Sequence, residues 1–319
     1  MKHSVFIFTY NRSILLKRQL NLFKLLNINS KIYLLDGSSD SVETNRNKKI
    51  ARDFKINYFY EKSYQNRFCL IDNIIQTPYL SYCADDDLID PRFYNYSVDF
   101  LEKNKDYAAV TGRILCLQYN FNLKFLGYRL VNHLPNDYDI NSNNFVSDII
   151  QLETAYRLGC PPTHYGVRRA ESHKILSKNV SKLKYLTSVE QLEKISILLT
   201  GGVKVLPFFF GLRDYYNNTT RDENRNPKPG DNSDNIVLQN VVKNYLLNKN
   251  KELSFAEFSS KFACNEDLKL TTRKNYLSFK ENKVKAVLDV IKHYVFRNID
   301  NLHDSGMDFK FEKAFRKVF

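Results

Sequence analysis

Tryptophan is absent from this sequence of 319 residues, and glycine is scarce, with only 10 residues. Nucleotide sites built on a glycine-rich phosphate loop need a GxGxxG or GxxxxGK(S/T) segment, in which backbone amides approach the phosphates closely. Neither pattern occurs in the chain. The sequence therefore excludes a nucleotide site of either glycine-loop type, and any nucleotide must be held by other groups.

The chain also lacks a cysteine framework and a long hydrophobic run. Its cysteines are odd in number, scattered and without a CxxC pair, which is typical of reduced thiols in a cytoplasmic protein. The apolar run Val5–Phe8 is too short for a signal-peptide core, and no later run approaches the length of a membrane span. We therefore expect a cytoplasmic protein that at most lies on the inner face of the membrane. The cysteines are Cys69, Cys83, Cys116, Cys160 and Cys264.

Hydrophobic residues make up 43% of the chain and aromatic residues 14%, which predicts a packed core. The net charge is +13, from 48 basic and 35 acidic residues. This balance favours anionic partners such as nucleotide phosphates, an anionic membrane surface, an acidic glycan or nucleic acid. Because the basic residues are spread over the whole chain and form no recognisable nucleic-acid module, we expect no nucleic-acid partner.

The first part of the chain alternates short apolar runs with helical patterns. After Asn11, apolar residues recur at Leu16, Leu20 and Phe23, which marks one face of a helix. Alternation of this kind predicts an α/β sheet with helices on its faces, and such sheets bind ligands beyond the carboxyl ends of their strands. The predicted strands are Val5–Phe8, Lys31–Leu35, Ile56–Tyr60 and Tyr79–Cys83, and the helices between the later strands are Ser41–Phe54 and Arg67–Ile75.

The second part is less regular. We predict two strands, Tyr107–Gly112 and Ile114–Tyr119, a polar loop over Val131–Asn144, a helix over Ser188–Leu199 and a strand over Val203–Phe210. Ser188 and Gln191 fit a capping box at the start of that helix.

Three regions follow from these patterns. Residues 1–215 form the α/β domain, and residues 216–235, rich in Asn, Asp, Pro and Gly, form a loop or linker. Residues 236–319 form a basic helical region, with an apolar face that includes Val284, Leu288 and Val295. Two interpretations of this region stay open, a helical cap with a solvated face and a peripheral contact with a membrane or an anionic polymer.

The strongest chemical signal is the aspartate run Asp85-Asp86-Asp87, which follows the Tyr79–Cys83 strand and precedes Pro91. Like charges so close together are unfavourable unless a cation or a hydrogen-bond network compensates them. Carboxylate oxygens suit Mg²⁺ or Mn²⁺, which take one or two protein carboxylates and complete their shell with phosphate and water. The alternative is a solvated acidic turn before a helix that begins at Pro91.

Two other strand exits carry polar groups. The first strand ends in Thr9-Tyr10-Asn11-Arg12, and the second runs into Asp36-Gly37-Ser38-Ser39-Asp40. Each segment alone also fits ordinary turn chemistry, because Asn, Asp, Gly and Ser are the usual turn residues. Three polar strand exits in this order, however, predict a common site.

The three segments, Thr9–Arg12, Asp36–Asp40 and the aspartate triplet before Pro91, occur here in the same order as in a known family. In them the sequence resembles the GT-A fold glycosyltransferases, and among these the bacterial enzymes of the family-2 type. The resemblance covers roughly residues 1–215. It implies a Rossmann-like mixed sheet flanked by helices, here with a helical C-terminal extension. It also implies transfer of a sugar from a nucleotide-sugar donor, as in the synthesis of bacterial surface polysaccharides.

The resemblance assigns the donor site residue by residue. Thr9, Tyr10 and Arg12 match the loop that cups the nucleotide base. Asp36 matches the aspartate that reads the base or the ribose, and Asp40 matches a less constant position.

Asp86 and Asp87 match the last two positions of the family's Asp-X-Asp-Asp signature, which hold the ribose and the metal. The chain departs from the signature at Ala84, where relatives have an aspartate. Asp85 is the candidate substitute, so the resemblance implies Asp87 as a direct ligand of Mn²⁺ or Mg²⁺. Asp85 then contacts the ribose or takes a second ligand position.

The resemblance places the general base in an acidic pair just before a helix. Glu190 aligns with that pair, and Gln191 replaces its acidic neighbour. Because a carboxylate in the first turn also interacts favourably with the helix dipole, a purely structural role for Glu190 stays open.

Arg67 and Arg213 are candidates to pair with the donor diphosphate, and for each the alternative is a surface ion pair. His164 either lines the acceptor cleft or makes a hydrogen bond within a rigid turn.

The predicted activity is a metal-dependent, inverting glycosyltransfer from a UDP- or GDP-sugar, ahead of a CMP-sugar, to a hydroxyl of a glycan or lipid-linked acceptor. A sugar nucleotidyltransferase is one alternative, although such enzymes normally begin with a glycine-rich loop. The other alternative is a catalytically silent glycan-binding relative with the same fold.

Overall fold

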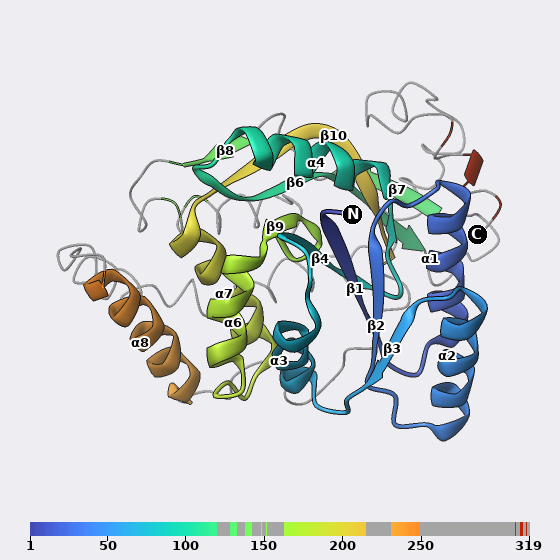
Figure 1. Ribbon diagram of the computed structural model, residues 1–319, viewed down its shortest axis with the longest axis horizontal. Helices are drawn as coiled ribbons and strands as arrows, with labels where there is room; N and C mark the ends of the chain where they lie inside the picture. Colours follow the sequence, from blue (N-terminus) through green and yellow to red (C-terminus); the bar gives the residue numbers. More distant parts are fainter. Residues whose placement is uncertain are drawn as a thin grey trace, which may run out of the picture.

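The computed structural model describes residues 1–119, 128–132, 138–141, 148, 151, 163–214, 231–248, 310, 313, 314 and 317. In these residues a single mixed sheet is covered by helices on both faces (Figure 1). The strand order along the sheet is β3-β2-β1-β4-β9-β6-β10-β5, with β7 paired to β6 and β8 paired to β10. The predicted α/β fold with a mixed sheet is confirmed.

The strands of this sheet fall into a parallel part and a mixed part. In the parallel part β1 lies between β2 and β4, and β3 forms the edge. In the mixed part β9 runs antiparallel to both of its neighbours, β4 and β6. The strands are β1 His3–Thr9, β2 Lys31–Asp36, β3 Asn57–Tyr60, β4 Tyr79–Ala84, β5 Leu88–Ile89, β6 Tyr107–Tyr119, β7 Tyr128–Asn132, β8 Tyr138–Ile140, β9 Val167–Arg169 and β10 Gly202–Asp214.

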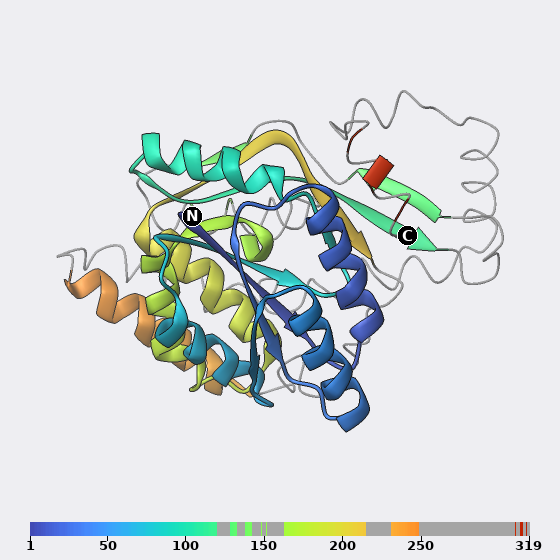
Figure 2. The ribbon, with the colours of Figure 1, turned by 45° about the vertical axis from the view of Figure 1, so that its right-hand side comes forward.

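The helices divide between the two faces of the sheet. Helices α1 and α2 lie on one side of β1–β3, and α3, α6 and α7 lie on the other, as Figures 1 and 2 both show. The bounds are α1 Ser13–Leu25, α2 Ser41–Asp53, α3 Tyr64–Ile74, α4 Arg92–Lys103, α6 Ala170–Val180, α7 Leu186–Thr200 and α8 Ser233–Asn248, with a short 3₁₀ turn, η2, at Thr163–Tyr165.

The alternation of side chains along β1 explains this two-sided packing. Val5 and Ile7 point into the core beneath α1, α2 and α4, whereas Phe6 and Phe8 point into the core beneath α3, α6 and α7. All four are buried. A strand buried on both faces has a continuous apolar sequence, which is the pattern that marks β1 in the sequence.

Three boundaries differ from the sequence-based prediction. Tyr107–Tyr119 is one strand, β6, instead of two. The stretch predicted as a polar loop contains β8 and part of β7. Helix α7 begins at Leu186 with Tyr185 as N-cap, so Ser188 lies inside the helix and the predicted capping box is wrong.

Helix α8 also begins earlier than predicted, at Ser233, inside the stretch assigned to the loop 216–235. Its residues Leu238 and Val242 are buried in the same core cluster as α7. The remainder of that loop up to residue 230, and the apolar face that includes Val284, lie outside the described residues.

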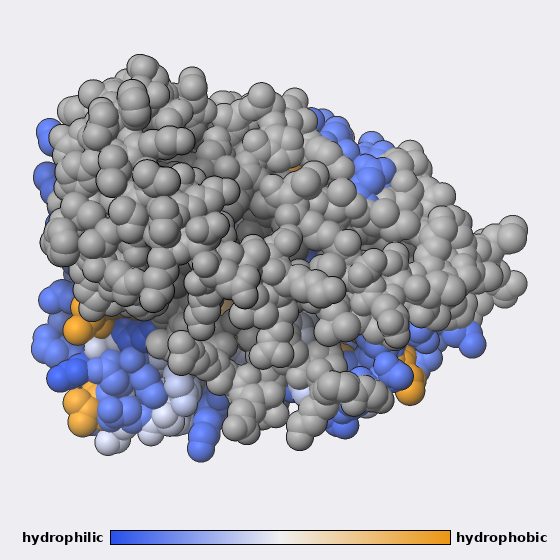
Figure 3. Space-filling view, turned by 180° about the vertical axis from the view of Figure 1, so that it is seen from behind, coloured by the Kyte–Doolittle hydropathy of each residue, from blue (hydrophilic) through white to orange (hydrophobic). Residues whose placement is uncertain are grey.

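No helix within the described part of the chain combines the length and the apolar character that a membrane crossing requires. On the face in Figure 3, the visible described residues are mostly hydrophilic, and hydrophobic ones form small separate spots. Scattered apolar residues of this kind are normal for a protein surface.

Candidate functional site

The carboxyl ends of β1, β2 and β4 lie at one edge of the sheet. β1 runs parallel to β2 and β4, and the register pairs Thr9 with Asp36 and Phe8 with Ala84. The three strands therefore end at the same level. Asp85 follows β4 directly and contacts Thr9. The structure thus brings together the three polar segments that the sequence singles out.

Asp85 is held by the exit of β1. Its Oδ2 accepts hydrogen bonds from Thr9 Oγ1 at 2.6 Å and from the Tyr10 amide at 3.4 Å. Arg12 Nη2 lies 2.7 Å from Oδ1. Burial disfavours the charged form and raises the pKa of Asp85 to about 7 against the opposing charge of Arg12, and the negative charge of Asp86 adds to the increase. Both oxygens of Asp85 are therefore engaged by groups of the protein.

The next two carboxylates are also shielded from solvent, since Asp86 is 8% exposed and Asp87 is 1% exposed. Asp86 Oδ2 accepts a hydrogen bond from Arg12 Nη1 at 2.5 Å, and Arg18 Nη2 donates to the Asp86 carbonyl at 2.6 Å. Burial acts to lower the pKa of Arg12, but the three aspartates raise it above its ordinary value. Arg12 therefore divides its positive charge between Asp85 and Asp86.

Asp36, at the end of β2, is fully buried. Its Oδ1 accepts a hydrogen bond from the Ser38 amide at 2.8 Å. Its Oδ2 accepts hydrogen bonds from Asn47 Nδ2 at 3.2 Å and from the Tyr58 hydroxyl at 2.9 Å. The carboxylate thus fixes the turn after β2, and its contact with a base or ribose stays a prediction.

The turns after β1 and β2 are joined through Asn11, which has a φ of 53°. Asparagine adopts this left-handed conformation more readily than most residues. Its Oδ1 accepts hydrogen bonds from the amides of Ser39 and Asp40, each at 3.1 Å. Tyr10 is 47% exposed, and its hydroxyl lies 3.0 Å from Ser39 Oγ. The two turns therefore form one surface with an exposed aromatic ring.

Arg67 reaches the same edge from α3. It is 5% exposed, and its Nη1 donates a hydrogen bond to the Thr9 carbonyl at 3.3 Å. Its guanidinium lies 5.6 Å from the centre of the Phe8 ring and 5.2 Å from that of Tyr64. A Cβ on Gly37 would lie 2.8 Å from Arg67 Cζ, so a glycine after β2 leaves room for the arginine. Burial lowers the pKa of Arg67.

Glu190 lies beyond the first turn of α7, because α7 begins at Leu186, two residues earlier than the sequence predicts. It is half-buried. Burial raises the pKa of Tyr64, and the charges of Glu190 and Glu193 add to the increase. Because Tyr64 also contacts Arg67, Glu190 faces the α3 side of the site.

Sequence reasoning missed a second acid on the same helix. Glu193 is buried, and its Oε1 lies 2.5 Å from Arg168 Nη2 while its Oε2 lies 2.8 Å from His164 Nδ1. Burial acts to raise the pKa of Glu193, but Arg168 and His164 together lower it to about 2. The i,i+3 spacing from Glu190 was the signal available in the sequence, since residues at this spacing share a helix face.

The aspartate turn, which we define as Asp85-Asp86-Asp87, fits a divalent cation at two of its three carboxylates. No group of three or more His, Cys, Asp or Glu side chains in the described residues is arranged to hold a metal alone. Mg²⁺ and Mn²⁺, however, need only one or two protein carboxylates when phosphate oxygens complete the shell. Asp86 and Asp87 match this need, whereas both oxygens of Asp85 are taken by Thr9 and Arg12.

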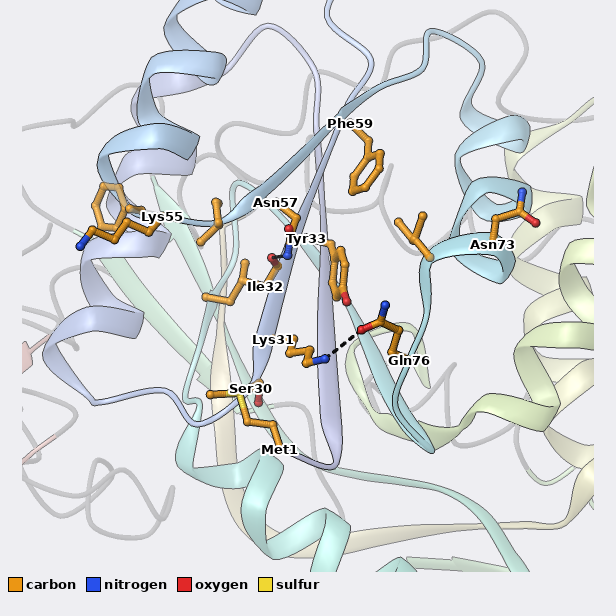
Figure 4. Close-up of a pocket in the computed structure, with 13 residues that line it drawn as sticks. Met1, Ser30, Lys31, Ile32, Tyr33, Lys55, Asn57, Phe59, Asn73 and Gln76 are labelled. Atoms are coloured by element: carbon orange, nitrogen blue, oxygen red, sulfur yellow. Dashed lines mark hydrogen bonds between the residues drawn. The ribbon is translucent and has the colours of Figure 1, made fainter.

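A hollow lined by described residues lies elsewhere. It has a volume of about 700 Å³ and opens near the amino ends of β1, β2 and β3. Figure 4 shows Tyr33 and Phe59 among its lining residues, together with a hydrogen bond from Lys31 Nζ to Gln76 Oε1. Because Asp36 and Asp85 follow the carboxyl ends of the strands, this hollow is separate from the candidate site.

Neither a protein-family model nor a curated protein matches this sequence. Solved structures do match it. The structure of S. aureus TarS residues 1–349 is similar over 100% of this chain and 90% of that chain, with a TM-score of 0.53 and 14% sequence identity. The same values hold for TarS 1–349 in complex with UDP-GlcNAc. The chain has the GT-A fold.

Two other TarS structures also match this chain. TarS 1–349 in complex with UDP matches at the same TM-score and identity. A longer TarS structure matches with a TM-score of 0.53 and 13% identity, and there the chain covers 55% of TarS. At this identity the likeness shows the fold, and the fold agrees with the resemblance found in the sequence motifs.

Most predicted donor-site residues therefore lie at one edge of the GT-A sheet. They are Thr9, Tyr10, Arg12, Asp36, Arg67, Asp85, Asp86 and Asp87. Arg213 belongs to β10, where the register pairs it with Cys116, but its side chain lies outside the described residues. Its role with the diphosphate stays a prediction.

Proposed function

We propose that the protein transfers a sugar from a nucleoside diphosphate to a hydroxyl of a glycan or lipid-linked acceptor. The observation that carries the proposal is the convergence of Thr9, Arg67 and the aspartate turn at the carboxyl ends of parallel strands. Ligands of open α/β sheets bind at this edge. The TarS complexes with UDP and UDP-GlcNAc support a UDP-sugar as the donor, ahead of a GDP- or CMP-sugar.

In this proposal each turn has a separate task in donor binding. The exposed ring of Tyr10 offers a stacking surface for the base, and the turn fixed by Asp36 borders the base and ribose. The hydrogen bond from Arg67 to the Thr9 carbonyl holds the guanidinium beside the strand ends. There it would pair with a phosphate of the donor.

Asp86 and Asp87 would hold Mn²⁺ or Mg²⁺ against the diphosphate. A bound cation supplies neutralisation of the negative charge that develops as the diphosphate leaves. Asp85 then acts as a positioning group, because Thr9 and Arg12 fix its carboxylate at the base of the turn.

The acceptor hydroxyl must lose a proton as its oxygen attacks the anomeric carbon. The family resemblance assigns this proton to Glu190, on α7. A base on the side opposite the leaving diphosphate gives inversion of configuration. A role in surface polysaccharide synthesis, a cytoplasmic location and a peripheral membrane contact through residues 236–319 belong to the same proposal.

Incubation with Mn²⁺ and a panel of UDP-, GDP- and CMP-sugars tests the proposed reaction. Release of a nucleoside diphosphate from one of these donors is the expected result. Release of pyrophosphate from a nucleoside triphosphate and a sugar phosphate would instead identify a nucleotidyltransferase. Binding of a donor or glycan without turnover would identify a silent relative.

A further inference from the structure

The guanidinium of Arg12 bridges two carboxylates of the aspartate turn. Its Nη2 lies 2.7 Å from Asp85 Oδ1, and its Nη1 lies 2.5 Å from Asp86 Oδ2. The proposed function gives Asp86 a second task, because it assigns Mn²⁺ or Mg²⁺ to Asp86 and Asp87. A cationic side chain of the protein therefore already pairs with one of the two proposed cation ligands.

The pairing of Arg12 with Asp86 opposes direct binding of a divalent cation to the same carboxylate. A carboxylate oxygen that binds Mg²⁺ lies about 2.0–2.1 Å from the ion. With the guanidinium also on that carboxylate, two positive centres would lie within roughly 5 Å of each other, a separation at which like charges repel. Binding of a cation to Asp86 therefore requires that Arg12 withdraw from it.

The contact of Arg12 with Asp85 does not depend on its contact with Asp86. Asp85 is fully buried, and its Oδ2 accepts hydrogen bonds from Thr9 Oγ1 and the Tyr10 amide, which fix the carboxylate at the exit of β1. Its Oδ1 pairs with Nη2 of Arg12, whereas Asp86 pairs with Nη1. A rotation of the arginine side chain can thus release Asp86 and keep Asp85.

The backbone around Arg12 and Asp86 is held by other contacts. The Arg12 carbonyl accepts hydrogen bonds from the amides of Leu15 at 3.0 Å and Leu16 at 3.1 Å, which begin α1. Arg18 Nη2 donates to the Asp86 carbonyl at 2.6 Å and so holds the turn from the same helix. The Arg12 side chain is 16% exposed and reaches the surface. Withdrawal from Asp86 therefore needs movement of this side chain alone.

We propose that Arg12 exchanges Asp86 for the donor diphosphate when the donor and its cation bind; this inference rests on the proposed function. The phosphates supply the negative charge that Arg12 gives up at Asp86, and arginine pairs with phosphate oxygens in the same two-nitrogen geometry as with carboxylates. Arg12 thereby makes the two ligands interdependent. The cation binds weakly alone and more tightly with the diphosphate, and by linkage the diphosphate binds more tightly with the cation.

Cation affinity without nucleotide is the measurement that isolates Arg12, because direct contact of phosphates with the cation also couples the two ligands. Arg12→Met removes the guanidinium and keeps an unbranched side chain. The dissociation constant of Mn²⁺ follows from the electron paramagnetic resonance signal of the free ion. With Asp86 left to the cation, we expect Mn²⁺ to bind this variant about tenfold more tightly than wild type.

Arg46→Met is the matched control for the loss of one positive charge. Arg46 is 59% exposed and pairs with Glu43 on α2, outside the aspartate turn. Its Mn²⁺ affinity should stay within twofold of wild type. A second series with UDP completes the comparison, since UDP should tighten Mn²⁺ binding by a smaller factor in Arg12→Met than in wild type.

Arg12→Lys keeps the charge, but its single ammonium lacks the two-nitrogen fork that bridges the carboxylates. Its Mn²⁺ affinity without nucleotide should be about threefold tighter than that of wild type, and it decides the question if circular dichroism shows Arg12→Met to be unfolded. A folded Arg12→Met within threefold of wild type, or an Arg12→Lys no tighter than wild type, overturns the role of Arg12 and leaves the cation site standing. Wild type that binds no Mn²⁺, with or without UDP, removes the cation from the proposed function, and the role of Arg12 falls with it.

Discussion

Asp85 at the strand ends and Glu193 on α7 are both buried carboxylates beside an arginine, yet their pKa values move in opposite directions. Burial raises the pKa of Asp85 to about 7, whereas at Glu193 the effect of burial is outweighed by Arg168 and His164, which lower the pKa to about 2. The difference lies in how the positive charge is shared. Arg12 pairs with both Asp85 and Asp86. Glu193 has Arg168 at 2.5 Å and His164 at 2.8 Å.

The two clusters differ in how the charges of their carboxylates are compensated. At the strand ends, adjacent carboxylates compete for one guanidinium, so an added cation relieves repulsion. On α7, one carboxylate is surrounded by donors, so its charge is already compensated and it serves as an anchor. The first arrangement suits ligand binding, and the second suits support of a neighbouring group.

The largest expected effect comes from Asp87→Ala, which tests the strand-end cluster as a cation site. We expect loss of Mn²⁺-dependent donor binding and a fall in turnover of about 10³-fold, because a bound cation supplies several kcal/mol of charge stabilisation. Calorimetry with UDP, with and without Mn²⁺, measures the binding. Asp53→Ala, an exposed carboxylate on α2, is the matched control and should retain activity. Full activity of Asp87→Ala would refute the site assignment.

Arg168→Met tests the charged cluster around Glu193 on α7. Removal of one partner from a buried pair leaves the second charge uncompensated, which typically costs about 3–5 kcal/mol of unfolding free energy. Urea titration measures this loss. Arg12→Met should lose less, because the side chain of Asp86 is 12% exposed and the buried Asp85, with a pKa of about 7, can take up a proton. A larger loss in Arg12→Met than in Arg168→Met would remove the distinction between the two clusters.

The pH dependence of the unfolding free energy tests Glu193 itself, with a somewhat smaller expected effect than that of Arg168→Met. The folded pKa of Glu193, about 2, lies below its ordinary value of 4.5, so its ionised form stabilises the fold. This contribution, about 3 kcal/mol, is present above pH 4.5 and is lost as the pH falls toward 2. Urea midpoints between pH 5 and pH 2 measure the loss. Glu193→Gln should flatten this part of the profile, and an unchanged slope would contradict the assignment.

The strand ends were predictable because their information is local. In a parallel sheet the exits of neighbouring strands lie at one edge, so Thr9, Asp36 and Asp85 could be placed together from their positions after apolar runs. Their partners inside the cluster, such as Arg18 and Asn47, were not predicted. Those contacts depend on how α1 and α2 pack against the sheet.

The α7 region was harder to predict because distant residues define it. The amides of Lys184 and Tyr185 donate to Asp234 on α8, so a tertiary contact fixes the chain just before α7, and the helix begins at Leu186. Propensity favoured Ser188 as the N-cap, and the contact with α8 overrode it. The pairing of His164 with Glu193 likewise joins η2 to α7, and no spacing in the sequence indicates it.

Asp40 gives the smallest effect and marks the border of the strand-end cluster. Its side chain accepts a hydrogen bond from the Val42 amide at 2.7 Å and so caps α2. Asp40→Ala should therefore cost about 1 kcal/mol of unfolding free energy, and Asp40→Asn, which keeps an acceptor, should cost much less. Donor affinity should be unchanged in both variants when measured by calorimetry. A tenfold weaker affinity in Asp40→Asn would instead show that the donor depends on the charge of Asp40, and the cluster would then extend beyond the aspartate turn.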